Sequence, residues 1–455
     1  MQEIEREDSM KTRLLALALL LIFLMGCSKT QAEPALEELP DETAELSPEE
    51  IQSAMHEIAP VPVRTGEEKD ASEFVTPDGE NIHFMTADGY QLVEGGAYLG
   101  GAWITYYDIS TGDTEVVCAK AGCTHSDETC PAWIGEESDY AYYRGSFYAL
   151  QRSDPSGAWA LQLRKRGTDG VSWETLWEYP EQSEGSLAAR GMLGGDWTVL
   201  TLERFLDDGT NTMEVLAVNL KDGTEKEVIA ETLVGLNAPA GSGEGRTLSI
   251  SLWGAAEGYC VISQSMLPAG FPTMDEYLES AGPMEDDQAV SAATDAYIAK
   301  LDTESVTEYA CYALANGEKT TISSGPTAEV SGVYDSTSLY LGDFYYFKDG
   351  AIRAFNLKEK TEKEILHAGH IDRITVADGQ VFYVLTVGDV CELDSYSLTD
   401  GVVTKFTNEG NDSVIVFTVY QENRDMFAGN YNGTECWITK EDYYAENFQS
   451  ATPIP

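Results

Sequence analysis

The chain beyond residue 81 alternates apolar and polar positions in short runs, the pattern of half-buried β-strands. Aromatic and β-branched residues fill these runs, and DG, TG and NG turns separate them. Strand–turn–strand units of this kind include AWITYYDISTGDTEVV, MEVLAVNLKDGTEKEVI, EYACYALANGEKTTI, AIRAFNLKEKTEKEIL and ELDSYSLTDGVVTKF. Each unit follows a further strand, and the whole recurs about every 40 residues, which is the period of β-propeller blades.

Seven such units are counted along the chain. They are centred on residues 80–118, 139–180, 190–230, 247–322, 327–367, 370–408 and 412–446. Evenly spaced short strands also occur in β-sandwiches. The regular period and the lack of long crossover helices favour a propeller over a sandwich. We therefore predict an all-β fold, a β-propeller of seven blades, with six or eight blades as alternatives.

The fourth unit is overlong because residues 266–304 have the periodicity of helices rather than strands. Thr273 is suited to cap a first helix. A second helix would carry four side chains on one face: Val290, Ala293, Tyr297 and Leu301. We expect a helical insertion in the fourth blade, either as a lid over the central channel or packed on the edge of the blade.

The N-terminal region predicts an exported lipoprotein. Two basic residues, Lys11 and Arg13, precede an apolar run at residues 14–25. Such a run, about 7–15 residues long and ending in a small residue, describes a secretory signal, whereas a membrane-spanning helix needs about 20 apolar residues. The sequence LMGC ends at Cys27 like a lipobox, in which that thiol is acylated. Because the first residues are acidic, translation is expected to start at Met10.

Three segments are therefore predicted. Residues 1–26 are a signal peptide, residues 27–79 an acidic tether and residues 80–455 the propeller domain. The tether is rich in proline and poor in aromatics, so it buries too little apolar surface to offset the entropy of ordering. The expected location is the bacterial cell membrane, on the extracytoplasmic face, with the lipid on Cys27 as anchor.

The net charge narrows the choice of partners. The chain has 78 Asp and Glu against 28 Lys and Arg, a formal net charge of −50. Such a surface repels phosphate backbones, which excludes nucleic acid as a partner, and it favours cations and basic proteins.

A pattern C-x4-C-x-H-x4-C combines Cys118, Cys123, His125 and Cys130. Three thiolates and an imidazole are a ligand set of zinc, so a structural zinc site is predicted. The alternative is a Cys123–Cys130 disulfide, which an oxidising exterior favours. In either case the cluster would pin the loop between the first and second blades.

The number of cysteines that remain after acylation of Cys27 is odd. Eight cysteines less the acylated one leave seven, so at least one thiol is unpaired or bound to something. The possible disulfides are Cys260–Cys311 within the fourth blade and Cys391–Cys436 between the last two.

Together with the lipobox, the acidic tether and the cysteine–histidine pattern, the closing sequence ITKEDYYAENF resembles a group of uncharacterised β-propeller lipoproteins of anaerobic Gram-positive bacteria. The resemblance covers nearly the whole mature chain. It implies a surface location and a propeller, and it implies no activity.

Enzymatic motifs are not evident, since neither G-x-S-x-G, H-E-x-x-H nor a P-loop occurs. We expect a monomeric, non-enzymatic binding module for a protein, peptide or glycan. The alternatives are an extracellular hydrolase or lyase acting on polysaccharide or peptide, and an envelope assembly scaffold. His367 and His370 have the spacing of a metal-binding pair, and the turn at residues 207–211 resembles part of a calcium loop, although loop and turn positions explain them better. Tryptophans on the central face of the propeller would stack on a ligand, and the ones considered are Trp103, Trp133, Trp159, Trp173, Trp197 and Trp253.

Overall fold

The architecture is taken from a computed structural model of the chain. It describes residues 82–455 except 87–88, 94, 136–137, 154–158, 167–169, 183–185, 207–210, 234–245, 283–286, 331–336, 369–370, 372, 388–389 and 407–416. The predicted signal peptide, Cys27 and the tether lie outside the described residues. In the described part, no helix has the length and apolar character needed to cross a membrane.

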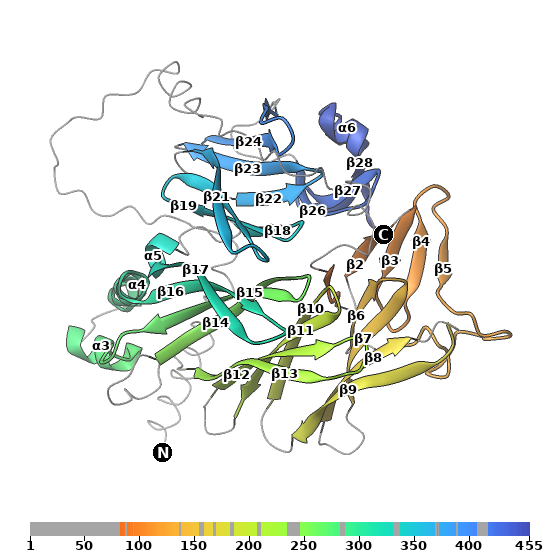
Figure 1. The fold of residues 1–455 in the computed structure, drawn as a ribbon, viewed down its shortest axis with the longest axis horizontal. Helices are drawn as coiled ribbons and strands as arrows, with labels where there is room; N and C mark the ends of the chain where they lie inside the picture. Colours follow the sequence, from red (N-terminus) through yellow and green to blue (C-terminus); the bar gives the residue numbers. More distant parts are fainter. Residues whose placement is uncertain are drawn as a thin grey trace. The chain divides into compact units, whose positions relative to one another are not determined.

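Seven four-stranded antiparallel meanders organise the described residues (Figure 1). Five are separate sheets. The other two, together with the short strand β1 (Ile82–His83), form one nine-stranded sheet through a single parallel contact between Leu233 and Thr247. We number the meanders as blades one to seven in chain order.

The strands of each blade run from the innermost to the outermost as follows. Blade one is β2 (Tyr90–Val93), β3 (Gly96–Leu99), β4 (Thr105–Asp108) and β5 (Thr114–Val116). Blade two is β6 (Ser138–Tyr143), β7 (Ser146–Ser153), β8 (Trp159–Arg166) and β9 (Trp173–Gln182). Blade three is β10 (Ser186–Gly194), β11 (Trp197–Phe205), β12 (Asn211–Asn219) and β13 (Glu225–Leu233). Blade four is β14 (Arg246–Ala256), β15 (Tyr259–Leu267), β16 (Val306–Ala313) and β17 (Glu318–Pro326).

The last three blades repeat the same order. Blade five is β18 (Thr337–Tyr340), β19 (Asp343–Lys348), β20 (Ala351–Asn356) and β21 (Thr361–His367). Blade six is β22 (Arg373–Ala377), β23 (Gln380–Val387), β24 (Val390–Ser397) and β25 (Val403–Lys405). Blade seven is β26 (Phe417–Glu422), β27 (Met426–Tyr431), β28 (Thr434–Thr439) and β29 (Thr452–Pro453).

The first strands of the seven blades form a closed ring. Strand β10 contacts β14, β14 contacts β18, β18 contacts β22, β22 contacts β26 and β26 contacts β2. Blade one joins blade two through Gln91, and β1 lies between β6 and β10. Apolar clusters fill the spaces between neighbouring blades. The fold is therefore a seven-bladed β-propeller, which confirms the prediction from the 40-residue period.

Two glutamine side chains pair the inner strands of neighbouring blades. Gln91 donates from Nε2 to the carbonyl of Tyr142 (2.7 Å) and accepts from the N–H of the same residue (2.7 Å). Gln421 of blade seven donates to the carbonyl of Tyr90 (3.0 Å) and accepts from the N–H of Leu92 (2.8 Å) in blade one. Each amide thus takes the place of a peptide group along a strand edge that would otherwise be unpaired.

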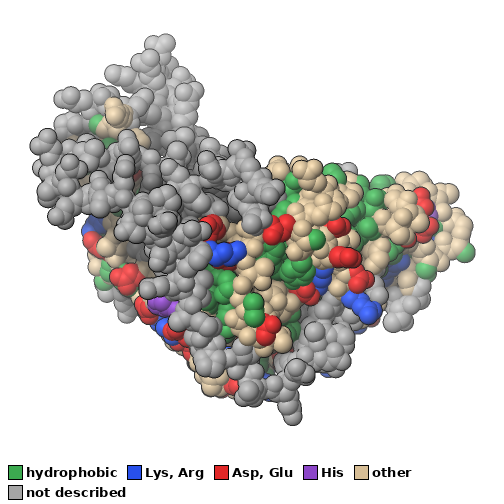
Figure 2. Space-filling model, turned by 90° about the horizontal axis from the view of Figure 1, so that it is seen from above, with side chains coloured by type: hydrophobic (Ala, Val, Ile, Leu, Met, Phe, Trp, Pro, Cys, Tyr) green, Lys and Arg blue, Asp and Glu red, His purple; other side chains and the backbone are tan. Residues whose placement is uncertain are grey.

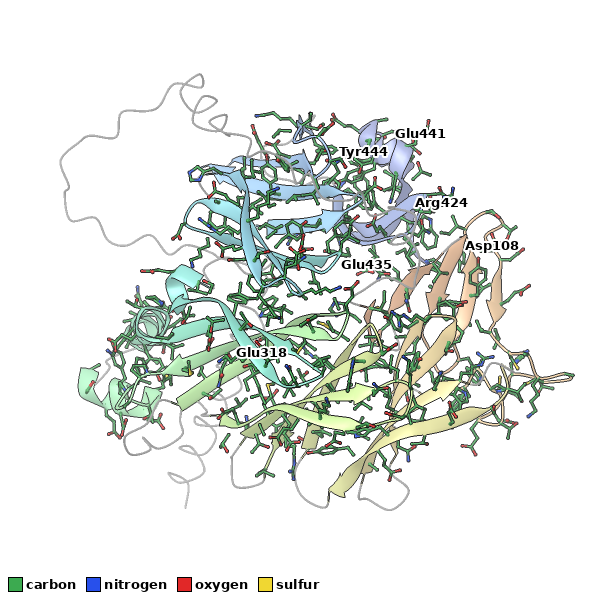
Figure 3. The ribbon with its side chains drawn as sticks, in the orientation of Figure 1. Asp108, Glu318, Arg424, Glu435, Glu441 and Tyr444 are labelled. Atoms are coloured by element: carbon green, nitrogen blue, oxygen red, sulfur yellow. The ribbon has the colours of Figure 1, made fainter. Side chains whose placement is uncertain are left out.

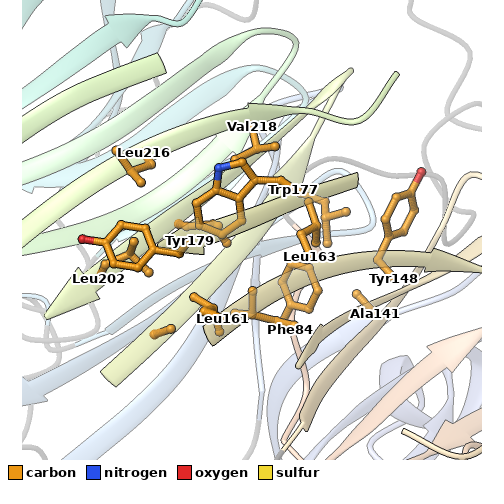
Figure 4. Packing of buried hydrophobic residues seen from close by; sticks show 14 of the residues in the cluster. Phe84, Ala141, Tyr148, Leu161, Leu163, Trp177, Tyr179, Leu202, Leu216 and Val218 are labelled. Atoms are coloured by element: carbon orange, nitrogen blue, oxygen red, sulfur yellow. The ribbon is translucent and has the colours of Figure 1, made fainter. Parts of the chain in front are cut away.

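Blades two and three are joined by backbone hydrogen bonds of residues 84 and 85, and not by a glutamine side chain. The N–H of Phe84 donates to the carbonyl of Gly191 (3.1 Å), while Met85 and Tyr140 exchange both backbone hydrogen bonds (2.7 and 2.8 Å). The Phe84 side chain is 9% exposed and belongs to the apolar cluster shared by these blades (Figure 4). A Cβ at position 191 would lie 2.9 Å from the ring of Phe84, so this close approach requires glycine.

The predicted helical insertion is confirmed between β15 and β16, as α3 (Met274–Ala281) and α4 (Asp287–Glu304). Thr273 caps α3, and its side chain and that of Glu276 exchange hydrogen bonds with each other's backbone N–H. The predicted face of α4 is turned inward at Tyr297, which is 1% exposed. Helix α4 contacts β17 and α5 (Thr327–Val330), both at the end of blade four. These contacts favour the edge-packed alternative over the lid.

The closing sequence ITKEDY locks blade seven to blade six. Lys440, the first residue of α6 (Lys440–Tyr444), is 8% exposed and bridges Asp378 of blade six and Glu422 of blade seven, each at 2.8 Å. Tyr444, labelled in Figure 3, donates its hydroxyl to the other oxygen of Asp378 (2.8 Å). Burial raises the pKa of the Glu422 carboxyl, and the ammonium of Lys440 opposes that shift.

A cluster of aromatic rings lies beside this ionic bridge. Tyr443 is fully buried, and its ring meets several others edge-on: Phe382, Phe417, Phe427 and Phe448. The single-turn 3-10 helix Phe448–Ser450 and the strand β29 then complete blade seven. The motif that marks the C-terminal end is thus explained by packing between the last two blades.

Replacing Lys440 by methionine should destabilise the protein by about 3–5 kcal/mol near neutral pH, because two carboxylates would remain close together without their counter-ion. The measurement is the free energy of unfolding in urea. The deficit should shrink as the pH falls, since protonation of Glu422, whose pKa is already raised, removes one of the two charges.

Lys405→Met is the matched control, because Lys405 pairs with Glu392 at 3.5 Å on a more exposed part of the surface. We expect this control to lose about 1 kcal/mol or less. Equal losses in the two variants would contradict the role assigned to Lys440.

Candidate metal centre

The structure brings the four predicted ligands together in the loop between β5 and β6. The three sulfurs and a ring nitrogen of Cys118, Cys123, His125 and Cys130 all lie within 4.8 Å of one another. His125 Nδ1 is 3.4 Å from the sulfur of Cys130. Cys118 and Cys123 are partly buried, and Cys130 is 2% exposed. Among the described residues, this cluster is the one group of three or more His, Cys, Asp or Glu side chains close enough together to hold a metal ion.

Tight turns fold the loop onto itself. Gly122 (φ 71°) and His125 (φ 52°) adopt left-handed backbone conformations. The carboxylate of Asp127 accepts from the N–H (3.0 Å) and the hydroxyl (2.6 Å) of Thr129, and the carbonyl of Asp127 accepts from the N–H of Cys130 (3.1 Å). These local hydrogen bonds bring the arm that carries Cys130 back towards the arm that carries Cys118.

Blades one and two hold both ends of the loop. Ile104 of blade one accepts from the N–H of Val117 (3.0 Å) and donates to the carbonyl of Ala132 (2.9 Å). On the other side, the indole N–H of Trp173 in β9 donates to the carbonyl of Pro131 (2.8 Å). The rings of Trp103 and Trp133 also meet edge to face, with centroids 4.6 Å apart. The ligand cluster therefore sits on a frame that two blades fix independently of any ion.

The thiols have unequal proton affinities. A hydrogen bond from the backbone N–H of His125 lowers the pKa of Cys123, and the charge of Lys120 adds to this effect. Burial raises the pKa of Cys130 to about 11. The ammonium of Lys120 is held close to the loop by the carbonyl of Thr129 (2.9 Å). A divalent ion bound by three thiolates carries a net charge of −1, which the neighbouring ammonium offsets.

The donor set fits zinc. Three sulfurs and one imidazole nitrogen provide all four positions of a tetrahedral site, as in structural zinc sites, and no position is left for a reacting water. These residues could hold such an ion, and its chemical contribution would be to link the two arms of the loop.

The predicted Cys260–Cys311 disulfide is not formed. Cys260 lies opposite Tyr312 and Cys311 opposite Val261, so the two thiols point to opposite faces of blade four. Both thiols are free and buried. Cys436 is also a free, buried thiol. The side chain of Cys391 lies outside the described residues.

A contact of Cys311 was not predicted from the sequence. The ammonium of Lys360, from blade five, lies 3.0 Å from the sulfur of Cys311 and 4.1 Å from the centre of the Tyr259 ring, both in blade four. Nothing in the sequence near either residue signals this pairing, because it depends on how two blades meet.

The weaker candidates do not converge on a site. His367 is exposed at the end of β21, whereas His370 and most of the turn at residues 207–211 lie outside the described residues. The indole of Trp253 donates to Ser263 within its own blade (2.7 Å), and Trp197 lies under Lys226. The side chain of Trp159 is outside the described ones. Trp103, Trp133 and Trp173 instead frame the metal-ligand loop.

Comparisons with known proteins identify remote structural likenesses. No protein-family model and no curated protein matches the sequence. Dipeptidyl peptidase 4 from Porphyromonas gingivalis is 10% identical over 84% of this chain, with a TM-score of 0.39, and the chain spans 61% of its length. The β-propeller domain of the trilobed protease from Pyrococcus furiosus is 14% identical, covering 74% of this chain and 83% of that one, with a TM-score of 0.35.

TolB from Acinetobacter baumannii is 11% identical, with 76% of this chain and 74% of that chain covered and a TM-score of 0.27. Likenesses at this level carry no argument about activity.

Proposed function

We propose that the protein is a lipid-anchored β-propeller on the extracytoplasmic face of a bacterial cell membrane, where it binds a protein, peptide or glycan. The proposal is supported by a complete propeller that follows, along the same chain, a segment with the sequence features of a secretory signal and of a lipobox ending at Cys27. Acylation would supply a membrane affinity that grows by about 0.8 kcal/mol per buried methylene.

A monomer is the expected state because one chain completes the ring. The junction between blades seven and one is made by Gln421 and by Asn423, whose amide donates to the carbonyl of Val93 (2.7 Å). No strand from a second copy is needed for closure. This arrangement supports a self-contained module at the end of a tether.

The surface charge favours a ligand that tolerates or seeks acidic groups. Acidic side chains are scattered over the visible face of the described residues, among apolar and polar groups (Figure 2). With a net charge of −50, the protein repels nucleic acid and other polyanions. A neutral glycan or a basic peptide or protein segment is the ligand class most compatible with this charge.

Catalysis by paired carboxylates is less well supported. Asp378 and Glu422 lie together, but the ammonium of Lys440 bridges them, so their geometry serves the contact between two blades. A general acid and base working on a glycosidic bond would have to face a bound substrate instead. We therefore propose binding rather than hydrolysis or lyase activity.

We also propose that the cluster of Cys118, Cys123, His125 and Cys130 holds one zinc ion. Its role would be structural, because it joins the two arms of the loop that connects blades one and two. Metal binding to such a site adds directly to folding stability, since the unfolded chain does not present the four ligands together.

The anchor is tested with the full chain in a Gram-positive host. Cys27→Ser should move the protein from the membrane fraction to the medium and abolish labelling by a fatty-acid analogue, because the acceptor thiol is gone. Ser28→Ala, which leaves Cys27 intact, should remain lipidated and membrane-bound. Persistence of the Cys27→Ser variant in the membrane fraction would refute lipid anchoring at this residue.

Binding without turnover is tested on arrays of cell-wall glycans and peptides. We expect retention of one ligand class, and recovery of that ligand with unchanged mass after prolonged incubation. The same protein unfolded in urea should retain nothing. A shortened ligand or an unsaturated product would replace this proposal by the hydrolase or lyase alternative.

Zinc is tested on protein purified anaerobically without reductant. Elemental mass spectrometry should find about one zinc per chain, and either Cys123→Ser or His125→Ala should remove most of it and lower the thermal midpoint, because three ligands bind zinc far more weakly than four. Cys436→Ser, outside the cluster, should keep its zinc. Equal metal contents in all four proteins would rule out the site.

A further inference from the structure

We infer that the Cys3His cluster closes its loop in two chemical states: as a metal–thiolate site under reducing conditions, and as a Cys123–Cys130 disulfide after oxidation. The inference rests on the metal site proposed above. Oxidation would modify Cys123 and Cys130, and their closeness would keep the loop closed in both states.

The sulfurs are close enough for either state. The sulfurs of Cys118, Cys123 and Cys130 and a ring nitrogen of His125 all lie within 4.8 Å of one another. A disulfide needs sulfurs about 2.0 Å apart with Cβ atoms about 3.5–4.5 Å apart. Rotations of the two cysteine side chains would bring their sulfurs most of the way to the disulfide separation.

The frame around the cluster keeps the thiols together when the ion leaves. Hydrogen bonds from Val117 and Ile104 fix the first arm of the loop and the backbone beyond Cys130, and Trp173 holds Pro131. None of these contacts uses a ligand atom. Loss of the metal therefore leaves both ends of the loop in place, with Cys123 and Cys130 still in the same short segment at high effective concentration.

Exposure sets the order of the reaction. Cys123 is partly exposed whereas Cys130 is 2% exposed, so an oxidant from solvent meets Cys123 first. With hydrogen peroxide as oxidant, the Cys123 thiolate attacks the O–O bond, forms a sulfenic acid and releases hydroxide. The Cys130 sulfur then attacks the Cys123 sulfur, forms the S–S bond and expels a second hydroxide.

The electrons and atoms balance. Two thiolates lose two electrons, one peroxide gains them, and two protons convert the two hydroxides into two waters. The metal departs as a divalent ion because Cys118 and His125 alone provide too few ligands. Of the two pairings open to Cys123, the one with Cys130 spans the turn and joins the same two arms as the ion; the pairing with Cys118 would leave the second arm unlinked.

The consequence is a staple that survives a change of redox conditions. The loop between blades one and two stays closed, first by coordination and then by a covalent bond. Cys260 and Cys311, on opposite faces of blade four, have no such option.

The test adds one equivalent of hydrogen peroxide to the zinc-loaded full chain. We expect release of about one zinc per chain to a chromogenic chelator and a mass about 2 Da below that of the metal-free, reduced chain. A tryptic fragment should contain Cys123 linked to Cys130. The thermal midpoint of the oxidised protein should stay close to that of the zinc form. A thiol reductant followed by zinc should restore the starting state.

Two variants sharpen the result. Cys130→Ser should lose the disulfide and unfold at a lower temperature after peroxide, whereas Cys436→Ser should exchange like the unmodified protein. Release of zinc without the Cys123–Cys130 link, retention of zinc, or an oxidised form as unstable as Cys130→Ser would each overturn the inference. A chain that never takes up zinc would instead refute the metal site itself, which separates the two failures.

Discussion

The structure depends on satisfying the inner edges of its seven first strands. Each of these strands has a neighbour within its blade on one side only, so its other edge presents backbone N–H and C=O groups that need partners. At the junctions of blade one with blades two and seven, the side-chain amides of Gln91 and Gln421 pair with these groups. Between blades two and three, the backbone of residues 82–85 does so. Blades one and two support the loop between them on both sides, and the four candidate ligand atoms of this loop lie within 4.8 Å of one another.

The junction between the first and last blades is made by side chains rather than by a shared strand. Blade seven is built wholly from the C-terminal end of the chain, and blade one from the beginning of the domain. Closure combines the polar contacts of Gln421 and Asn423 with an apolar cluster in which the rings of Tyr107 and Trp437 stack. Lys440 and Tyr443 tie blade seven back to blade six. The closing sequence ITKEDY has a structural role in this arrangement, since its lysine and its first tyrosine are both buried.

The sequence alone predicted the number of blades, the insertion and the membership of the metal-ligand cluster, because each depends on local spacing. The period of strand pairs and turns sets the blades, and C-x4-C-x-H-x4-C places its ligands within one loop. Long-range register was not predictable. The pairing of Cys260 with Cys311 failed because a shift of one residue along β15 and β16 decides which face each thiol occupies. The roles of Gln421 and Lys360 likewise depend on contacts between blades.

The entry of the chain into the ring has a mechanical consequence. The first described strand, β1, lies on the inner side of blade three, and Phe84 is wedged between blades two and three. Tension applied to the chain ahead of Ile82 is thus delivered to the hub of the propeller rather than to an outer strand at its rim. Peeling a rim strand would unravel one blade, whereas pulling here loads two blades at once through a buried aromatic ring. With the N-terminal anchoring proposed above, a pulling force would therefore reach the hub before any outer strand.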